Sequence, residues 1–252
     1  MYMIKKVVIA AAGRGTRMLH LTKNKPKHLI KVCQNPFLTY LFDNLLEAGY
    51  RELILVVGHK KEKMEEFLTE KKYKVRVINQ FEILGEEEYG TACAVKCVKD
   101  IVGKEDFLTI YGDHLFSTRD LKSFNIEDSY NYMAGLHHHH PEKYGVLEIE
   151  DSFLKKIVEK PKKYIGNLIN IGLYKFTPEI FDKVSEVQLS ERKEYELTDA
   201  INMLAEEKKV RVRQIQDFWL DLSNPADIIR ASQFIKNGNH KGFIRKVKKD
   251  DQ

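Results

Sequence analysis

The segment from Ala11 to Arg17 carries the strongest chemical signal in this chain of 252 residues. It follows an apolar run and reads Ala11-Ala12-Gly13-Arg14-Gly15-Thr16-Arg17. Its two glycines allow backbone N–H groups to approach a phosphate closely, and its two arginines add positive charge. It is not the dinucleotide fingerprint, because Met18 stands where a third glycine would be, and no Walker A Gly-Lys-Ser/Thr follows. Taken alone, the segment predicts either a phosphate-binding loop or an ordinary glycine-rich turn.

Alternating apolar and amphipathic segments in the first half predict the framework that holds this loop. Four apolar runs are typical of strands buried on both faces, at 7–10, 53–57, 75–78 and 107–111. Helical patterns are expected from Pro36 to Gly49 and over 60–72 and 91–101. This order predicts an α/β fold with a Rossmann-like, doubly wound, mostly parallel sheet. Such sheets bind ligands at the carboxyl ends of their strands, where the glycine-rich loop lies.

The second half has a different pattern, which predicts a mixed lobe that binds substrate. Short strands are expected at 130–137, 146–149, 154–158, 169–176, 210–215 and 218–222, with helices over 197–207 and 225–235. No repeat and no Gly/Pro-rich linker divides the chain. We therefore expect one domain over residues 1–240, made of halves of about 1–115 and 116–240, and a basic tail over 241–252.

The composition is that of a globular protein. Hydrophobic residues make up 43% of the chain and charged residues 31%, and the early apolar run is too short to span a membrane. Three cysteines (Cys33, Cys93 and Cys97) are too few for a disulfide scaffold, so a cytoplasmic location is expected. Much of the net charge of +5 lies in residues 236–252, which hold six lysines and arginines against two aspartates. We interpret this end as a solvated tail and expect no nucleic-acid or membrane partner.

Further motifs follow the loop in a fixed order along almost the whole chain. They are Leu21-Thr22, Pro26-Lys27, Gly90-Thr91-Ala92, Gly112-Asp113, Tyr144-Gly145-Val146, Glu159-Lys160-Pro161, Asn170-Ile171-Gly172, Glu196-Leu197-Thr198-Asp199-Ala200 and Trp219-Leu220-Asp221. Each motif alone is weak, but their order and spacing together are specific. The chain resembles the sugar-1-phosphate nucleotidyltransferases (NDP-sugar pyrophosphorylases), and most closely the glucose-1-phosphate uridylyl- and thymidylyltransferases that lack a β-helix domain.

The resemblance implies a nucleotide-diphospho-sugar transferase fold and a nucleotidyl transfer. A sugar 1-phosphate oxygen attacks the α-phosphorus of a nucleoside triphosphate, and pyrophosphate leaves. The second pKa of a phosphate monoester is about 6, so the nucleophile is already ionised at neutral pH and needs no general base. Catalysis then consists of in-line positioning and neutralisation of phosphate charge by Arg, Lys and Mg²⁺.

For the nucleotide, the resemblance assigns roles to residues of the first half. Gly13, Gly15 and Thr16 would cradle the triphosphate, and Arg17 would neutralise the leaving pyrophosphate. Lys27 would reach the α-phosphate and the phosphate of the incoming sugar. Gln80 is the candidate for reading the base, together with backbone groups near Ala11, Ala12, Gly90 and Thr91. Gln80 lies ten residues before Gly90, a longer gap than the family pattern suggests.

For the metal and the sugar, the resemblance assigns roles at the ends of later strands. Asp113 and Asp221 would hold Mg²⁺, which typically takes one or two carboxylates plus phosphate oxygens. Glu159 would accept hydrogen bonds from sugar hydroxyls, and Lys160 would contact the sugar phosphate. Gly145 and Asn170 would line the sugar pocket. The catalytic set is therefore Arg17, Lys27, Asp113, Lys160 and Asp221.

Four local features depart from the family pattern or stand outside it. His20 replaces the usual proline, and His114 follows Asp113, where it could tune the metal site or cap the strand. The run His137–His140 is internal, and successive histidines of an extended chain face opposite sides, so we interpret it as a solvated strand end. Cys93 and Cys97 are interpreted as buried small hydrophobes.

The leading hypothesis is an enzyme that makes an NDP-sugar from a hexose 1-phosphate and UTP or dTTP. One alternative is a cytidylyltransferase acting on a non-sugar phosphate such as inositol 1-phosphate or phosphocholine. Another is a non-catalytic regulatory subunit of the same fold, although the retained phosphate and metal residues favour catalysis. The sequence leaves open the base, the sugar and assembly into a homo-oligomer. Because the chain ends soon after its last helix, we expect no hexapeptide-repeat β-helix and no second activity.

Overall fold

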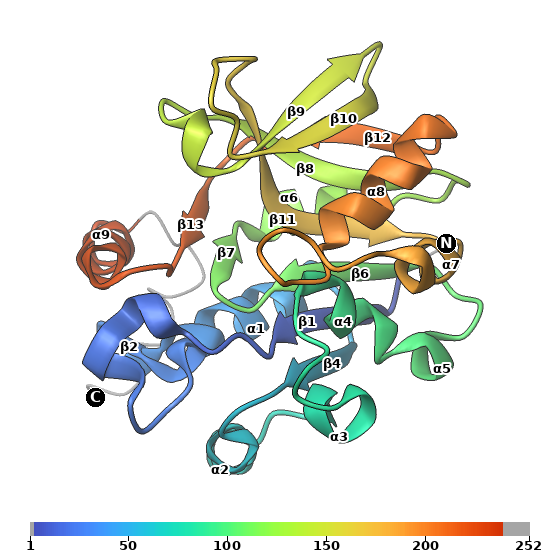
Figure 1. Cartoon of the computed structure of the whole chain (residues 1–252). Coiled ribbons are helices and arrows are strands. Elements are labelled where there is room, and N and C mark those ends of the chain that lie inside the picture. Colours follow the sequence, from blue (N-terminus) through green and yellow to red (C-terminus); the bar gives the residue numbers. More distant parts are fainter. Residues whose placement is uncertain (1–2, 239–252) are drawn as a thin grey trace.

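One mixed sheet runs through both halves of the chain in the computed structural model, which describes residues 3–238 (Figure 1). The basic tail predicted at 241–252 lies outside the described residues. From edge to edge the sheet contains β5 (Val75–Asn79), β4 (Glu52–Val57), β1 (Lys6–Ala11), β6 (Phe107–Tyr111), β11 (Leu168–Phe176), β8 (Asn131–His137), β12 (Val210–Gln214), β10 (Phe153–Glu159) and β9 (Gly145–Glu150).

Strands β5, β4, β1 and β6 are all parallel, as the sequence predicts. The α-helices within residues 3–238 are α1 (Phe37–Ala48), α2 (Lys61–Lys71), α3 (Gln80–Leu84), α4 (Thr91–Lys96), α5 (Lys99–Val102), α6 (Thr118–Ser123), α7 (Ile180–Glu186), α8 (Leu197–Glu206) and α9 (Pro225–Lys236). Val7 and Ile9 of β1 pack into a core with α1 and α2. Val8 packs into a second core with α4, α7 and α8, which lie in front of the sheet in Figure 1. Helices therefore cover both faces, and the doubly wound prediction is confirmed.

The second half extends the sheet in mixed directions. Strand β11 runs antiparallel to β6 and β8, whereas β12 is parallel to β8. Strands β10 and β9 complete the far edge as an antiparallel pair. Because β11 hydrogen-bonds directly to β6, the parallel part of the sheet continues without a break into the second half of the chain. The predicted mixed second-half lobe is therefore present.

Short elements account for the differences from the sequence prediction. The helix expected over 91–101 is two helices, because the backbone of Val98 (φ −110°, ψ 4°) leaves the helical region between them. Strand β7 (His114–Phe116) and helices α6 and α7 were not predicted. Elements of three to seven residues contain too few repeats for a clear hydrophobic period. No helix within residues 3–238 has the length and apolarity needed to cross a bilayer.

A two-stranded ribbon brings residues 219–222 next to the turn that follows β6. Strand β13 (Trp219–Asp221) pairs antiparallel with β7, and Asp221 lies opposite His114. The next residue, Leu222, donates its N–H to the carbonyl of Asp113 at 2.8 Å. Helix α9 then begins with a capping box formed by Asn224 and Asp227. The pairing places the last predicted motif beside the Gly112-Asp113 motif.

Candidate active site

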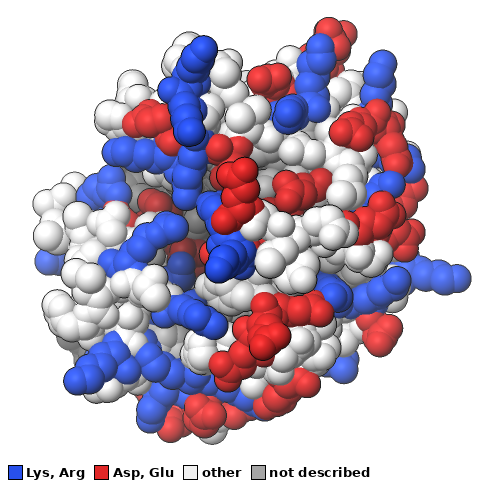
Figure 2. All heavy atoms as spheres, viewed as in Figure 1, with Lys and Arg blue, Asp and Glu red and all other residues white. Residues whose placement is uncertain are grey.

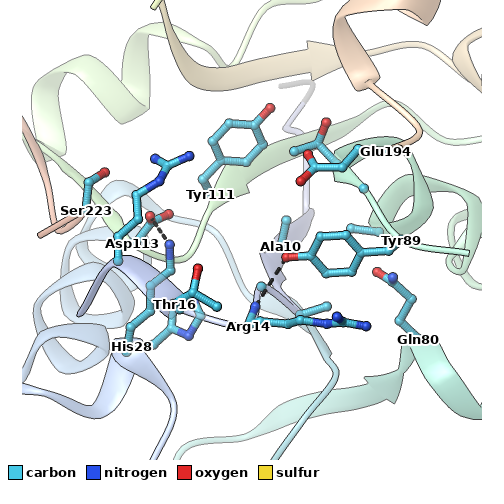
Figure 3. A pocket seen from close by; sticks show the side chains of 18 residues that line it. Ala10, Arg14, Thr16, His28, Gln80, Tyr89, Tyr111, Asp113, Glu194 and Ser223 are labelled. Carbon is cyan, nitrogen blue, oxygen red and sulfur yellow. Dashed lines mark hydrogen bonds and ion pairs between the residues drawn. The ribbon is translucent and has the colours of Figure 1, made fainter. Parts of the chain in front are cut away.

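A polar cleft of about 280 Å³ opens at the carboxyl ends of β1 and β6 (Figure 3). This is the edge of the sheet at which the sequence predicts ligand binding. The cleft is lined by Ala10, Ala12, Gly13, Arg14, Gly15, Thr16, Arg17, Lys27, His28, Gln80, Tyr89, Gly90, Thr91, Ala94, Tyr111, Asp113, Glu194 and Ser223. Basic and acidic side chains both lie around the hollow in the middle of this face of the molecule (Figure 2).

The glycine-rich loop forms the floor of the cleft and needs glycine at Gly15. The backbone of Gly15 is left-handed, with φ at 67°, and a Cβ there would lie 3.2 Å from Cγ2 of Thr22. The Thr22 hydroxyl donates a hydrogen bond to the Gly15 carbonyl at 3.1 Å, which ties the loop to the following 3-10 turns, Thr16–Thr22. Arg17 lies on these turns and is exposed. The Arg17 guanidinium can therefore contact an anion that binds above the loop.

Lys27 and Asp113 form an ion pair at the centre of the cleft, and the pair joins two segments 86 residues apart. Burial alone would raise the pKa of Asp113, but Lys27, followed by His114 and His28, holds that pKa well below its usual range. Asp113 is therefore a carboxylate at any physiological pH. Burial, followed by the neighbouring Lys27, lowers the pKa of His28 to about 3, so this histidine is neutral.

Gln80 and the start of α4 form the far end of the cleft. The Gln80 side chain is 1% exposed and its Nε2 donates to the carbonyl of Glu88 at 3.1 Å. Its Oε1 is buried and has no partner among the described residues, so a ligand could supply one. Gly90 precedes α4 as its N-cap, and the Thr91 hydroxyl accepts the N–H of Leu197 at 2.9 Å. This end of the cleft therefore offers an unpaired amide acceptor that could read a hydrogen-bond donor.

The predicted sugar residues lie on or beside the neighbouring strands β9, β10 and β11, outside the residues that line the cleft. Gly145 pairs with Glu159 across β9 and β10, and a Cβ on Gly145 would lie 3.0 Å from the Glu159 carboxylate. Lys160 follows with a left-handed backbone (φ 44°) and donates its N–H to the carbonyl of Tyr144 at 3.0 Å. This glycine therefore leaves room for the glutamate at the end of β10.

Asn170 is connected to the cleft through two tyrosines. Its Oδ1 accepts hydrogen bonds from the Tyr174 hydroxyl at 3.0 Å and from the N–H of Gly172 at 3.1 Å. The Tyr174 hydroxyl lies 3.3 Å from that of Tyr111, which lines the cleft. Gly172 (φ 70°) leaves room for Tyr111, whose ring would lie 2.4 Å from a Cβ at that position. The β6–β11 pairing thus joins the predicted sugar pocket to the predicted nucleotide pocket.

Residues 6–238 match the nucleotidyl transferase family along nearly the whole described chain. The chain belongs to the nucleotidyl transferase family. Among the curated proteins, it is 32% identical over 230 residues to a bifunctional sugar-1-phosphate nucleotidylyltransferase/acetyltransferase of Sulfurisphaera tokodaii. That alignment covers 91% of this chain and 55% of the relative, so the chain spans about half the length of this bifunctional protein.

Two other relatives match this member of the nucleotidyl transferase family along nearly their whole length. A UTP–glucose-1-phosphate uridylyltransferase of Haloferax volcanii is 32% identical, and the match covers 90% of this chain and 95% of that protein. A UDP-glucose pyrophosphorylase structure in complex with UDP-glucose superposes with a TM-score of 0.81 at 26% identity, covering 93% and 99% of the two chains. The predictions of the family and of its Rossmann-like α/β fold are confirmed.

The structure of this nucleotidyl transferase brings ten of the predicted site residues together around the cleft. They are Ala12, Gly13, Gly15, Thr16, Arg17, Lys27, Gln80, Gly90, Thr91 and Asp113. Gln80 is among them despite its unusual distance from Gly90 along the chain. Ala11, Gly145, Glu159, Lys160, Asn170 and Asp221 do not line this cleft. Asp221 nevertheless lies across the β7–β13 ribbon from the residue that follows Asp113.

Sequence reasoning missed several residues that line the cleft in this nucleotidyl transferase. Four of them lie one or two positions along the chain from a predicted residue: His28, Tyr89, Tyr111 and Ser223. The residues that flank each motif could therefore have been predicted as candidates. Glu194 lies on the loop before α8, two residues ahead of the Glu196-Leu197-Thr198-Asp199 motif. Its place in the cleft depends on how that loop folds, which no local pattern indicates.

Proposed function

We propose that this nucleotidyl transferase moves a nucleotidyl group from a nucleoside triphosphate to a hexose 1-phosphate and releases pyrophosphate. The observation that carries the proposal is the cleft itself. It combines a glycine-rich loop at the carboxyl end of β1, the Lys27–Asp113 pair and the unpaired Gln80 carbonyl oxygen. The glycine-rich loop suits a triphosphate, and the Lys27–Asp113 pair suits the charge of its phosphates. The Gln80 carbonyl oxygen suits a hydrogen-bond donor of the base. UTP and dTTP are the triphosphates that we favour.

The chemistry that we propose is an in-line displacement at the α-phosphorus. An oxygen of the sugar 1-phosphate forms a bond to that phosphorus while the bond to the β-phosphate oxygen breaks, and the electron pair leaves with pyrophosphate. Gly13, Gly15 and Thr16 hold the triphosphate, and Arg17 neutralises the charge of the leaving group. Lys27 contacts the α-phosphate and the incoming phosphate. No proton is transferred, because the attacking phosphate is already ionised.

Asp113 and Asp221 fit the role of magnesium ligands in this proposal. The low pKa of Asp113 keeps its carboxylate ionised, and the β7–β13 pairing places Asp221 beside the same turn. No group of three or more potential metal ligands occurs within residues 3–238, so two carboxylates and phosphate oxygens would have to suffice, as they do for Mg²⁺. Bound Mg²⁺ would offset phosphate charge. Lys27 already offsets the charge of Asp113, and it would be available to phosphate oxygens once the ion took over that task.

We propose that the predicted sugar residues on and beside β9, β10 and β11 bind the sugar 1-phosphate. Glu159 accepts hydrogen bonds from the sugar hydroxyls, and Lys160 contacts the phosphate. Gly145 leaves space for the glutamate, and the two hydrogen bonds to Asn170 hold this side chain at the pocket wall. The presence of this polar group on one wall favours a hexose over phosphocholine, whose trimethylammonium group donates no hydrogen bonds.

We also propose that residues 1–240 act as one catalytic domain in the cytoplasm. The support for one domain is the sheet, in which β6 and β11 join the two halves directly. The support for the location is the cysteine content, with Cys33, Cys93 and Cys97 all present as free thiols.

A matrix of substrates tests the proposal against its alternatives. UTP, dTTP, CTP, ATP and GTP are each combined with several hexose 1-phosphates, inositol 1-phosphate and phosphocholine, and pyrophosphate release is measured. We expect release with a pyrimidine triphosphate and a hexose 1-phosphate. Release only with CTP and a non-sugar phosphate would support the cytidylyltransferase alternative, and no release in any well would support the regulatory subunit.

A further inference from the structure

The Glu194 carboxylate occupies an unexpected place for an anion, on the wall of a cleft that we assign to a triphosphate (Figure 3). It makes no hydrogen bond or ion pair with any residue between 3 and 238, although its backbone is hydrogen-bonded. Glu196, two residues later, is by contrast paired with Arg192 at 2.8 Å. Arg192 is near enough for the charge of Glu194 to raise its pKa, but it makes no salt bridge with Glu194. A carboxylate with no hydrogen-bond partner would repel phosphates and suits a neutral part of the ligand that donates hydrogen bonds.

The backbone of the loop around Glu194 is fixed on both sides, so the fold sets where this side chain starts. The Ser190 N–H donates to the Glu194 carbonyl at 3.0 Å, and the Glu194 N–H donates to the Ser190 hydroxyl at 3.3 Å. The next residue, Tyr195, donates its N–H to the Tyr89 carbonyl at 2.9 Å. Its own carbonyl accepts the N–H of Ala92 at 3.0 Å. The loop is therefore attached to the base end of the cleft.

Gly90 makes this attachment possible. A Cβ at Gly90 would lie only 2.2 Å from the Tyr195 carbonyl oxygen, so the loop can approach α4 this closely only over a glycine. The Leu197 N–H adds a further bond to the Thr91 hydroxyl at 2.9 Å. Glu194 consequently belongs to the nucleotide pocket, whereas Glu159 and Asn170 lie outside the lining of that cleft.

In Figure 3, Glu194 lies on the same side of the cleft as Tyr89 and Gln80, and Asp113 lies on the other side. Gln80 is the proposed base reader, and Lys27 and Asp113 are the proposed phosphate and metal groups. The part of a nucleotide that lies between base and phosphate is the ribose. A carboxylate can accept both hydroxyl protons of the 2′,3′-diol of ribose, as an acidic residue does in dinucleotide-binding folds.

We propose that Glu194 binds the ribose 2′- and 3′-hydroxyls and makes this enzyme selective for ribonucleoside triphosphates. The triphosphate is then UTP rather than dTTP. This inference rests on the proposed function, because it takes the cleft to be the nucleotide site. A 2′-deoxy substrate leaves one carboxylate oxygen without its donor, and a charged acceptor that loses a hydrogen bond is penalised strongly.

UTP and dUTP test the proposal, since they share a base and differ only at the 2′ position. We would measure kcat/KM for each at saturating hexose 1-phosphate, and the Kd of each by calorimetry, for the parent chain, Glu194→Ala and Glu194→Gln. Glu191→Ala is the control, because Glu191 is exposed on the same loop and does not line the cleft. We expect the parent and the control to prefer UTP by about 10- to 100-fold.

Glu194→Ala should remove most of that preference. It should lower kcat/KM for UTP and leave kcat/KM for dUTP within about twofold of the parent value, and Glu194→Gln should be intermediate. Equal use of UTP and dUTP by the parent chain would overturn the proposal. The proposal would also be overturned if Glu194→Ala lowered kcat/KM equally for UTP and dUTP, or if it changed only the KM for the sugar 1-phosphate. If no triphosphate turns over, the proposed function fails, and the calorimetric UTP/dUTP ratio still decides the role of Glu194.

Discussion

The Tyr89 hydroxyl accepts the backbone N–H of Arg14 at 3.3 Å, within the glycine-rich loop (Figure 3). The Arg14 guanidinium also lies over the Tyr89 ring, 5.2 Å from its centre. The same hydroxyl would lie 3.9 Å from a Cβ on Gly13. Tyr89 therefore occupies a loop N–H that a phosphate oxygen would be expected to use.

We predict that Tyr89→Phe lowers the KM for triphosphate by a few fold with little change in kcat, because the competing hydroxyl is gone. Titration calorimetry should show the same gain in affinity. Tyr164→Phe is a suitable control, since Tyr164 is 78% exposed and outside the cleft. A higher KM in Tyr89→Phe would mean that the hydroxyl contacts the nucleotide instead of competing with it.

Asp113→Asn should fold normally and lose about 10²–10³ in rate, because the proposed metal site loses a charged ligand. Circular dichroism checks the fold, and initial rates over a Mg²⁺ titration check the role. Asp151→Asn, in an exposed turn, should behave like the parent. Full turnover of folded Asp113→Asn, or of the parent protein in EDTA, would refute the metal assignment.

Arg17 and Lys160 should act on different substrates. Arg17 lines the cleft, so Arg17→Ala should raise the KM for triphosphate or lower kcat by about 10- to 150-fold. Lys160 follows β10, so Lys160→Ala should weaken use of the sugar 1-phosphate and largely spare triphosphate binding. Initial rates with each substrate varied in turn, plus calorimetry with triphosphate, measure the split.

Lys162 is exposed on the same loop as Lys160, and Lys162→Ala should be near neutral. If Lys160→Ala abolished triphosphate binding and spared the sugar 1-phosphate, the assignment of the two halves would be reversed. If both Arg17→Ala and Lys160→Ala behaved like the parent, the regulatory-subunit alternative would gain support.

The sequence predicted the framework of this site well and its long-range contacts poorly. The apolar run in β1 and the helix between Pro36 and Gly49 have strong local signals, and both occur where expected. The Tyr111–Tyr174–Asn170 chain depends on the antiparallel register of β6 and β11, which only the folded sheet fixes. The proximity of Asp221 to Asp113 likewise depends on two strands of three residues, too short to show alternation.

His28 should make the stability of the metal-free protein fall as the pH falls. Its pKa is about 3 in the folded protein, because of burial and then Lys27, against 6.5 in the unfolded chain. Below pH 6.5 the unfolded state therefore binds a proton that the folded state does not. The free energy of unfolding should fall by about 1.4 kcal/mol per pH unit between pH 6.5 and 3 from this group alone.

Urea unfolding in EDTA from pH 7.5 to 4.5 measures this slope. His28→Gln should show a shallower dependence on pH than the parent protein, whereas the exposed control His139→Gln should retain the parent slope. Equal slopes in His28→Gln and the parent protein would show that folding does not lower the pKa of His28.

The central claim is tested most directly by a single stoichiometric measurement with the purified chain. UTP, glucose 1-phosphate and Mg²⁺ are mixed with the protein, and ³¹P NMR follows every phosphorus species. The account predicts one pyrophosphate and one UDP-sugar for each UTP consumed, with no reaction when either substrate is omitted. The claim would be contradicted if a folded chain that binds UTP released inorganic phosphate instead, or released pyrophosphate without a sugar 1-phosphate.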